Sequence, residues 1–185
     1  MSNKVNFGLK NAHYAVITET AGAITYGTPK RLPGAVSLSL EPKGETSDFY
    51  ADDIIYYTTS ANQGYEATLE LASVTEEFRT EVLGETLSTT DKVIIENAAA
   101  KPKKVALMFE FDGDVKATRH LLVYCTVNRP GLSGATKTES TEPGTTELSV
   151  VASPRATDGI VKISTSTTTS EDVYGAWFTE VYEGA

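Results

Sequence analysis

The chain has 185 residues, with 25 acidic against 16 basic side chains and a formal net charge of −9. This length suits one domain, which can bury roughly 70% of the surface that its unfolded form exposes. The acidic balance argues against a surface that grips nucleic acid, because such affinity comes mainly from Lys and Arg.

Threonine, other β-branched residues and aromatic residues fill the periodic stretches of the chain, which predicts a mainly β protein. A first strand is expected over residues 14–20. Residues 35–41 and 65–71 then alternate strictly between apolar and polar side chains. Each of these two strands should have one dry and one wet face, as in an antiparallel sheet covered on one side. The polar set is Ser37, Ser39, Glu41, Glu66, Thr68 and Glu70.

Between these two strands, residues 47–59 predict a hairpin of unusual composition, with large apolar side chains around an acidic turn at residues 51–53. So many large apolar groups are hard to cover within one small domain. An exposed patch of this kind usually marks a place where another protein binds. Its candidate interface residues are Phe49, Tyr50, Asp52, Asp53, Ile54, Ile55, Tyr56 and Tyr57.

A helix is predicted over residues 74–83. Ser73 and Glu76 have the spacing of a capping box, and Gly84 suits the C-terminal stop. Val74, Phe78 and Val82 fall on one stripe of this helix, which should pack on the sheet.

The second half of the chain predicts mostly strands. A short strand is expected at 93–95, a basic turn at 101–104, and a hairpin formed by 105–111 and 117–128 around the turn at Asp112, Gly113 and Asp114. Residues 131–145 are either a mobile loop or an exposed edge ribbon. Strands resume at 147–153 and 160–164. Near the C-terminus, a short helix starting at Ser170 would place Val173, Trp177, Phe178 and Val181 on one side.

Few residues are candidates for chemistry. His13 and His120 lack metal-ligand spacing, and no phosphate-binding glycine loop or nucleophile elbow occurs. The Asp pairs at 52–53 and 112–114 are better interpreted as turn residues than as Ca²⁺ ligands or paired catalytic carboxylates. Cys125 is expected in the core. We therefore expect no enzyme activity, no metal and no cofactor.

Two further expectations concern charge and location. Arg119 and Arg155 could clamp carboxylates of a neighbouring subunit, or could form ordinary ion pairs within the chain, and the sequence favours neither. No apolar run approaches the ~20 residues of a membrane helix, and the first ten residues lack the apolar core of a secretory signal. The protein is expected to fold in a cytoplasm and not to insert into a membrane.

An ordered set of residue strings resembles a known family. These strings are NKVNFGLKNAHYAVI, PGAVSLSLEP, FYADDIIYYTT, GYEATLEL, FRTEVLGE, FEFDGD followed by ATRH, ASPR and the terminal WF. Together they are similar to the major tail proteins, the tail tube subunits, of long-tailed non-contractile bacteriophages. The resemblance covers residues 3–182, essentially the whole chain.

The resemblance implies a single tail tube domain over residues 1–185, built as a β-sandwich or half-barrel with one flanking helix and similar to type VI secretion tube proteins. It also implies an N-terminal arm at about 1–12 and a C-terminal arm at about 165–185. Six copies would close into a ring, and rings would stack into a tube that delivers double-stranded DNA without binding it specifically. The implied partners are other copies of the chain, a tape-measure protein, and tail terminator and distal tail proteins. The implied location is the virion tail, after assembly in the bacterial host cytoplasm.

On this view residues 47–59 join one ring to the next, and the polar set led by Glu66 and Glu70 faces the channel. Without the resemblance, the same polar set would simply solvate an exposed sheet face. A second hypothesis from another class is a monomeric β-sandwich binding or adhesin domain, in which the aromatic hairpin grips a ligand or a cell-surface partner.

Overall fold

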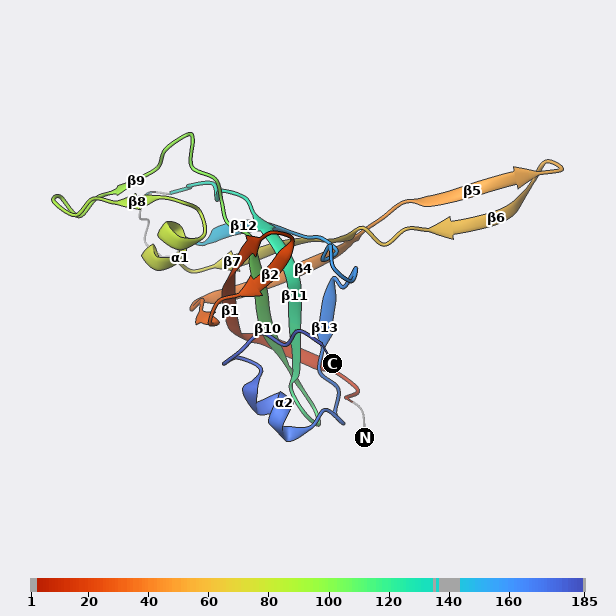
Figure 1. Ribbon diagram of the computed structural model, residues 1–185. Helices are drawn as coiled ribbons and strands as arrows, with labels where there is room; N and C mark the ends of the chain where they lie inside the picture. Colours follow the sequence, from red (N-terminus) through yellow and green to blue (C-terminus); the bar gives the residue numbers. More distant parts are fainter. Residues whose placement is uncertain (1–2, 135, 137–143, 185) are drawn as a thin grey trace.

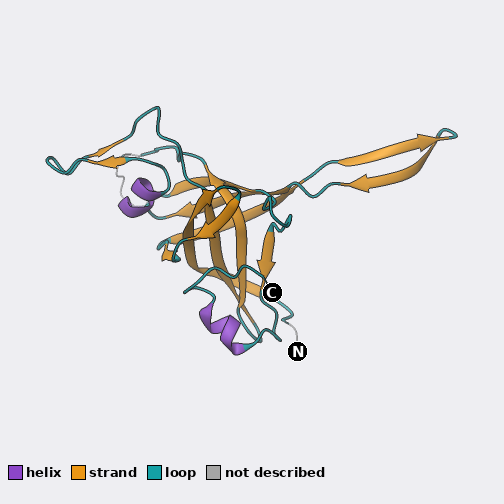
Figure 2. Ribbon diagram, viewed as in Figure 1, coloured by secondary structure: helices purple, strands orange, loops and turns teal. Residues whose placement is uncertain are grey.

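A computed structural model describes residues 3–134, 136 and 144–184 of the chain. It is mainly β, with one large antiparallel sheet, two separate two-stranded ribbons and two short helices (Figures 1 and 2). This is the mainly β architecture with flanking helix that the strand periodicity predicts. In order across the sheet, the strands are β2 (Ala23–Tyr26), β1 (Asn6–Thr20), β10 (Val105–Gly113), β11 (Thr118–Val127), β12 (Thr146–Ala152), β7 (Gly64–Leu71) and β4 (Ala35–Lys43), with β3 (Lys30–Arg31) on β1 and β13 (Lys162–Ser164) on β11.

The sheet packs on both faces. One face carries the larger cluster, which includes Tyr14, Phe109 and Leu122 of the sheet. Phe78 of the helix α1 (Glu76–Glu81) belongs to the same cluster and packs edge-on against Tyr14. The C-terminal segment, which contains α2 (Glu171–Ala176), covers the other face over β1, β10 and β11. Trp177, directly after α2, is buried there. The predicted stripe of Val173, Trp177, Phe178 and Val181 belongs to this second cluster, and Cys125 is fully buried in the first, as expected.

The first strand is longer than its pattern indicates. Alternation predicts a start near residue 14, whereas β1 begins at Asn6 and pairs with β10 from Gly113 onward. Register shifts interrupt this pairing around Gly8 and Asn11, both of which have positive φ. Such bulges interrupt the two-residue alternation of apolar and polar side chains without ending the strand. The alternation is therefore lost before residue 14, although the strand still pairs with β10 there. Most of the expected N-terminal arm is therefore part of the sheet.

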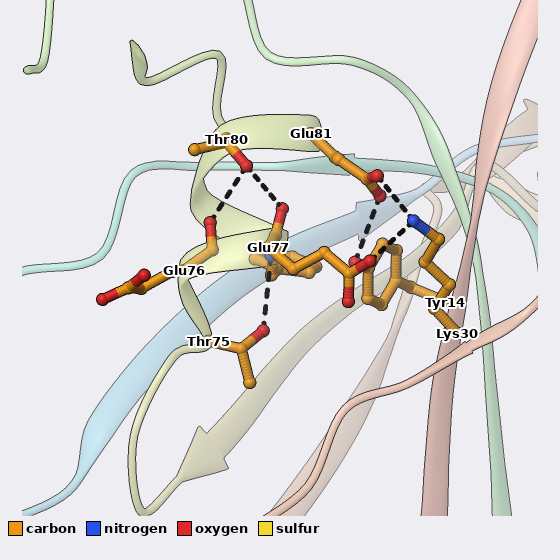
Figure 3. A network of polar contacts seen from close by, with 8 residues as sticks. Tyr14, Lys30, Thr75, Glu76, Glu77, Thr80 and Glu81 are labelled. Carbon is orange, nitrogen blue, oxygen red and sulfur yellow. Dashed lines mark hydrogen bonds and ion pairs between the residues drawn. The ribbon is translucent and has the colours of Figure 1, made fainter. Parts of the chain in front are cut away.

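Helix α1 is shorter than expected and begins at a different cap. The Thr75 hydroxyl accepts a hydrogen bond from the backbone N–H of Phe78 at 3.3 Å, so Thr75 is the cap and the Ser73 prediction is wrong (Figure 3). Phe78 and Val82 are buried as predicted, and Gly84 takes a positive φ just beyond the helix.

Polar contacts tie α1 to the sheet. The Lys30 ammonium on β3 lies 2.7 Å from the Glu77 carboxylate and 2.5 Å from that of Glu81, and the Tyr14 hydroxyl donates to Glu81 at 3.4 Å (Figure 3). These two carboxylates raise the pKa of Lys30 through their hydrogen bonds, whereas burial is the main reason that the pKa of Tyr14 is raised.

The remaining predicted elements differ in their ends. The expected strand at 93–95 is β9 (Ile94–Ile95), which pairs with β8 (Thr86–Leu87), and β10 continues through Gly113, so the turn moves to residues 114–117. The Asn3 side chain holds that turn by accepting from the Lys116 backbone N–H at 3.0 Å and donating to the Lys116 carbonyl at 2.6 Å. Residues 135 and 137–143 of the loop or ribbon predicted at 131–145 lie outside the described residues. Among those that are described, no helix has the length and apolar character needed to cross a membrane.

Candidate functional site

Several large exposed apolar side chains lie together on a ribbon formed by β5 (Thr46–Ala51) and β6 (Ile54–Ser60), as the sequence predicts. We call residues 44–63, which link β4 to β7, the β5–β6 arm. Asp52 and Asp53 form its turn with φ values of 52° and 60°, the backbone that a tight two-residue hairpin turn requires and that Asp tolerates. Figure 1 shows the arm projecting far beyond the sheet.

The arm presents large apolar side chains on both of its faces. Exposure ranges from 53% at Ile55 to 72% at Tyr56. Successive side chains of a strand point to opposite faces, so the consecutive apolar residues of each strand divide between the two sides of the ribbon. Both sides of the ribbon therefore offer apolar surface to a partner. The exposed set is Phe49, Tyr50, Ile54, Ile55, Tyr56 and Tyr57.

A second feature is the polar face of the sheet at its β4 edge. On β7 the alternation is as predicted, because Ala67 and Leu69 are buried while Glu66 and Thr68 are exposed. On β4 the prediction fails at Val36, which is 52% exposed where the pairing with β7 shifts register between residues 35 and 37. Pairing between β4 and β7 sets three polar pairs side by side on this face: Ser37 with Glu70, Ser39 with Thr68, and Glu41 with Glu66.

The two glutamates of β7 differ in their surroundings. Glu70 accepts hydrogen bonds from the hydroxyls of Thr145 at 2.6 Å and Ser37 at 2.7 Å, and these bonds hold its pKa below the usual range. Glu66 instead lies 2.8 Å from the Lys43 ammonium, which offsets part of its charge. The charge of Glu70 is thus held by two hydroxyl groups, whereas that of Glu66 is paired with a cation.

The polar face extends onto β12, which sequence reasoning did not include. Glu147 pairs with Glu70 and Ser149 with Thr68, while Leu148 and Val150 between them are buried. The alternation of polar and apolar residues within 146–152 already indicated that β12 has one polar face. The missing information was that β12, some 75 residues further along the chain, is the other neighbour of β7.

The two arginines suggested for contacts between subunits are engaged within the chain. Arg119 lies opposite Glu110 across β10 and β11, and its Nε donates to that nearly buried carboxylate at 2.7 Å. The Arg119 guanidinium also donates to the Tyr174 carbonyl and lies 3.8 Å from the centre of the Tyr174 ring. Of the two possibilities for Arg119, the ion pair within the chain is therefore the one observed. Its contacts with Glu110 and Tyr174 hold α2 against the sheet.

Arg155 has a similar place. It pairs with Asp158 within its own turn, and it donates to the Tyr26 hydroxyl at 3.2 Å and to the Glu183 carbonyl at 3.0 Å. Only 5% of the residue is exposed, so Arg155 holds the C-terminal segment against the sheet and leaves little of its guanidinium for another subunit.

The histidines and paired aspartates lie in structural environments. His120 packs against the Phe109 ring with 5.2 Å between ring centres, and burial together with Lys162 lowers its pKa to about 4. His13 stacks on Phe178, and Asp112 lies 2.6 Å from the Lys10 ammonium. Across residues 3–134, 136 and 144–184, no three His, Cys, Asp or Glu side chains gather as a metal site would require.

No protein-family model matches the chain, and no curated protein matches its sequence. The features that indicate a function are therefore the β5–β6 arm, the polar face and the edge strands of the large sheet, together with the motif resemblance.

Proposed function

We propose that this chain is a structural subunit that assembles into six-membered rings, and that these rings stack into the tail tube of a long-tailed, non-contractile bacteriophage. The observation that carries the proposal is the β5–β6 arm, which holds six large exposed apolar side chains well beyond the sheet. Large exposed apolar patches mark interaction sites, and water-exposed aromatic residues at such density are costly for a protein that stays alone.

A stacked tube needs two kinds of contact, and the fold offers both. In-plane contacts close a ring, whereas head-to-tail contacts leave a free surface at each end and therefore build a filament. Among the described residues, strand β4 ends the order of the large sheet on one side and β2 ends it on the other. Edge strands of this kind can pair with a strand of a neighbouring subunit. The arm would supply the second contact, because it extends well past the ends of β4 and β7 and so can reach a second ring.

The polar face suits the wall of a channel for DNA. Six copies carry a formal charge of 6 × −9 = −54, but only groups within about 8 Å of the DNA influence its passage at physiological salt. Glu70, kept ionised by its hydrogen bonds, together with Glu66, Glu41 and Glu147, would repel phosphates and keep DNA from adhering. The proposed role requires no catalysis and no cofactor. It places the protein in the virion tail, with a tape-measure protein and the terminator and distal tail proteins as partners.

A second candidate is a monomeric β-sandwich binding or adhesin domain. The same arm favours it, since a projecting aromatic ribbon can grip a ligand or a cell-surface protein. The two proposals differ in the partner of the arm, which is another copy of the chain in the first and a foreign molecule in the second.

Electron microscopy and analytical ultracentrifugation of the purified chain, over a wide concentration range, separate the two. The tube proposal expects sixfold rings and tubes that grow in number with concentration. A monodisperse monomer at the highest concentration reached, with and without added nucleating tail components, would rule out the tube and leave the binding domain.

A further inference from the structure

A second projection lies at the other end of the molecule from the β5–β6 arm. We call residues 86–104, from the start of β8 to the residue before β10, the β8–β9 loop. It extends in the opposite direction from the arm, on the far side of the sheet (Figure 1). Leu87, Val93 and Ile95 in this loop are 40% to 51% exposed, so it too offers apolar surface without cover in the single chain.

The arm and the loop have opposite charge. The arm contains Glu45, Asp48, Asp52 and Asp53 and no basic residue, a net charge of −4. The loop contains four lysines against Asp91 and Glu96, a net charge of +2 on a chain whose total is −9. Lys92, Lys101 and Lys103 are exposed, whereas Lys104 is partly buried and donates to the Thr126 hydroxyl.

From this complementarity we infer that the β8–β9 loop is the docking surface for the β5–β6 arm of a second copy of this chain. The inference rests on the proposed stacking and specifies its contact. Apolar side chains of the arm cover Leu87, Val93 and Ile95, and the aspartates of the tip lie among Lys92, Lys101 and Lys103. The contact is head-to-tail, because the arm and the loop project from opposite ends of one molecule.

Charge also disfavours the simplest competing arrangement. A symmetric contact of arm against arm would bring two groups of −4 together, and like charges placed side by side oppose association. The arm-to-loop contact instead pairs −4 with +2. The apolar side chains then supply most of the affinity, and the charges determine which surfaces meet and in which direction the stack grows.

A charge exchange tests the inference. The arm-reversed variant, E45K/D48K/D52N/D53N, changes the arm from −4 to +2, and Asn keeps the left-handed turn that Asp52 and Asp53 form. The loop-reversed variant, K92D/K101E/K103E, changes the loop from +2 to −4, with Asp chosen because Lys92 has a φ of 56°. All seven substitutions are at exposed positions, so circular dichroism and thermal unfolding should match those of the original chain.

Each variant alone should fail to form tubes under conditions in which the original chain forms them. In the arm-reversed variant a positive arm meets a positive loop, and in the loop-reversed variant a negative arm meets a negative loop. An equal mixture of the two should form tubes, because each arm then finds an oppositely charged loop on the other variant. A variant that carries all seven changes should assemble by itself.

Tube formation by either single variant at the original efficiency would overturn the inference and leave the proposed function standing. So would a mixture that stays unassembled although both variants are folded. If the original chain forms no rings or tubes and no copies associate in the mixture, the proposed function fails as well.

A second measurement uses no substitutions. Carbodiimide treatment of assembled original chain joins carboxylates to amines that are in direct contact. It should yield links from the tip aspartates to Lys92, Lys101 or Lys103, and these must be intermolecular because the two regions lie at opposite ends of one molecule. Tubes whose tip aspartates are linked to other lysines would overturn the inference.

Discussion

The Arg119 guanidinium lies 2.7 Å from the Glu110 carboxylate, and both side chains are largely removed from water. Asn11 of β1 also donates to Glu110, at 3.2 Å, while Arg119 extends to the carbonyl of Tyr174 in α2. This pair thus joins three parts of the chain: the first strand, the central hairpin and the C-terminal helix.

We expect R119M to destabilise the chain by about 3 kcal/mol, because it leaves the nearly buried Glu110 carboxylate without its cation. Urea unfolding of the isolated subunit measures the loss. The matched control is K43M, which breaks the exposed pair with Glu66 and should cost less than about 1 kcal/mol. Equal unfolding midpoints for R119M and the original chain would show that the buried pair carries no stability.

The two tyrosines of β6 should matter for assembly and not for folding. Tyr56 and Tyr57 are 72% and 62% exposed in the single chain, so Y56S/Y57S removes little intrachain packing and the melting temperature should stay nearly unchanged. Aromatic anchors at interfaces are worth ~2 kcal/mol or more each, so the folded variant should no longer form tubes in electron micrographs. Normal tubes from this variant would remove the arm from the stacking contact.

Two single substitutions test which residue caps helix α1. T75A should lower the free energy of unfolding by about 1 kcal/mol, because the Phe78 N–H loses the hydroxyl that accepts its hydrogen bond. S73A, which removes the cap expected from the sequence, should leave stability unchanged. Chemical unfolding of both variants measures these free energies. A larger loss of stability in S73A than in T75A would contradict the assignment of Thr75 as the cap.

Stability should fall as the pH drops from about 6.5 to about 4, in part through His120. Burial keeps its imidazole neutral in the folded chain, with a pKa of about 4 against 6.5 for an unperturbed histidine. Between these values the unfolded chain binds a proton that the folded chain does not, so acid favours unfolding.

The H120F variant keeps a ring stacked beside Phe109 and removes the titration. Its free energy of unfolding should therefore decline less than that of the original chain over the same pH interval. The difference between the two declines gives the contribution of His120, separate from that of carboxylates that titrate in the same pH range. Parallel curves would show that His120 is protonated equally in both states.

The polar face makes a prediction for assembled tubes. E66K/E70K reverses charge beside the proposed channel, and tubes of this variant should retain double-stranded DNA in a salt-dependent way, whereas the original tubes should not. The control E180K/E183K makes the same charge change on the C-terminal segment. Co-sedimentation measures retention, and DNA retained equally by both variants would place Glu66 and Glu70 away from the channel.

Local patterns predicted the parts of the fold that depend on near neighbours. Alternation placed Glu66, Thr68 and Glu70 on one face, and the acidic turn with its apolar flanks predicted the hairpin that became the β5–β6 arm. The parts that failed depend on distant partners. Glu110 faces Arg119 only because of the register of β10 and β11, and Glu147 joins the polar face only because β12 lies beside β7.

Local competition explains the other differences. Ser73 and Thr75 both have side chains that can cap a helix, and the chain still follows an irregular path after β7 at Ser73. Bulges at Gly8 and Asn11 removed the periodicity of β1 while its pairing continued. In both cases the residue types are compatible with the observed structure. The exact position of the cap and of the bulges is set by tertiary contacts, which local sequence does not reveal.

The isolation of the β5–β6 arm has a consequence for when assembly begins. Within the described part of the chain, strands β5 and β6 pair only with each other, and a two-stranded hairpin without further support is marginally stable in water. The arm therefore keeps conformational entropy that the strands of the large sheet have already lost on folding, and it loses that entropy when another copy covers it. Each addition to a growing stack bears this ordering cost, which raises the concentration at which free subunits begin to polymerise and disfavours tubes that start away from a preformed end.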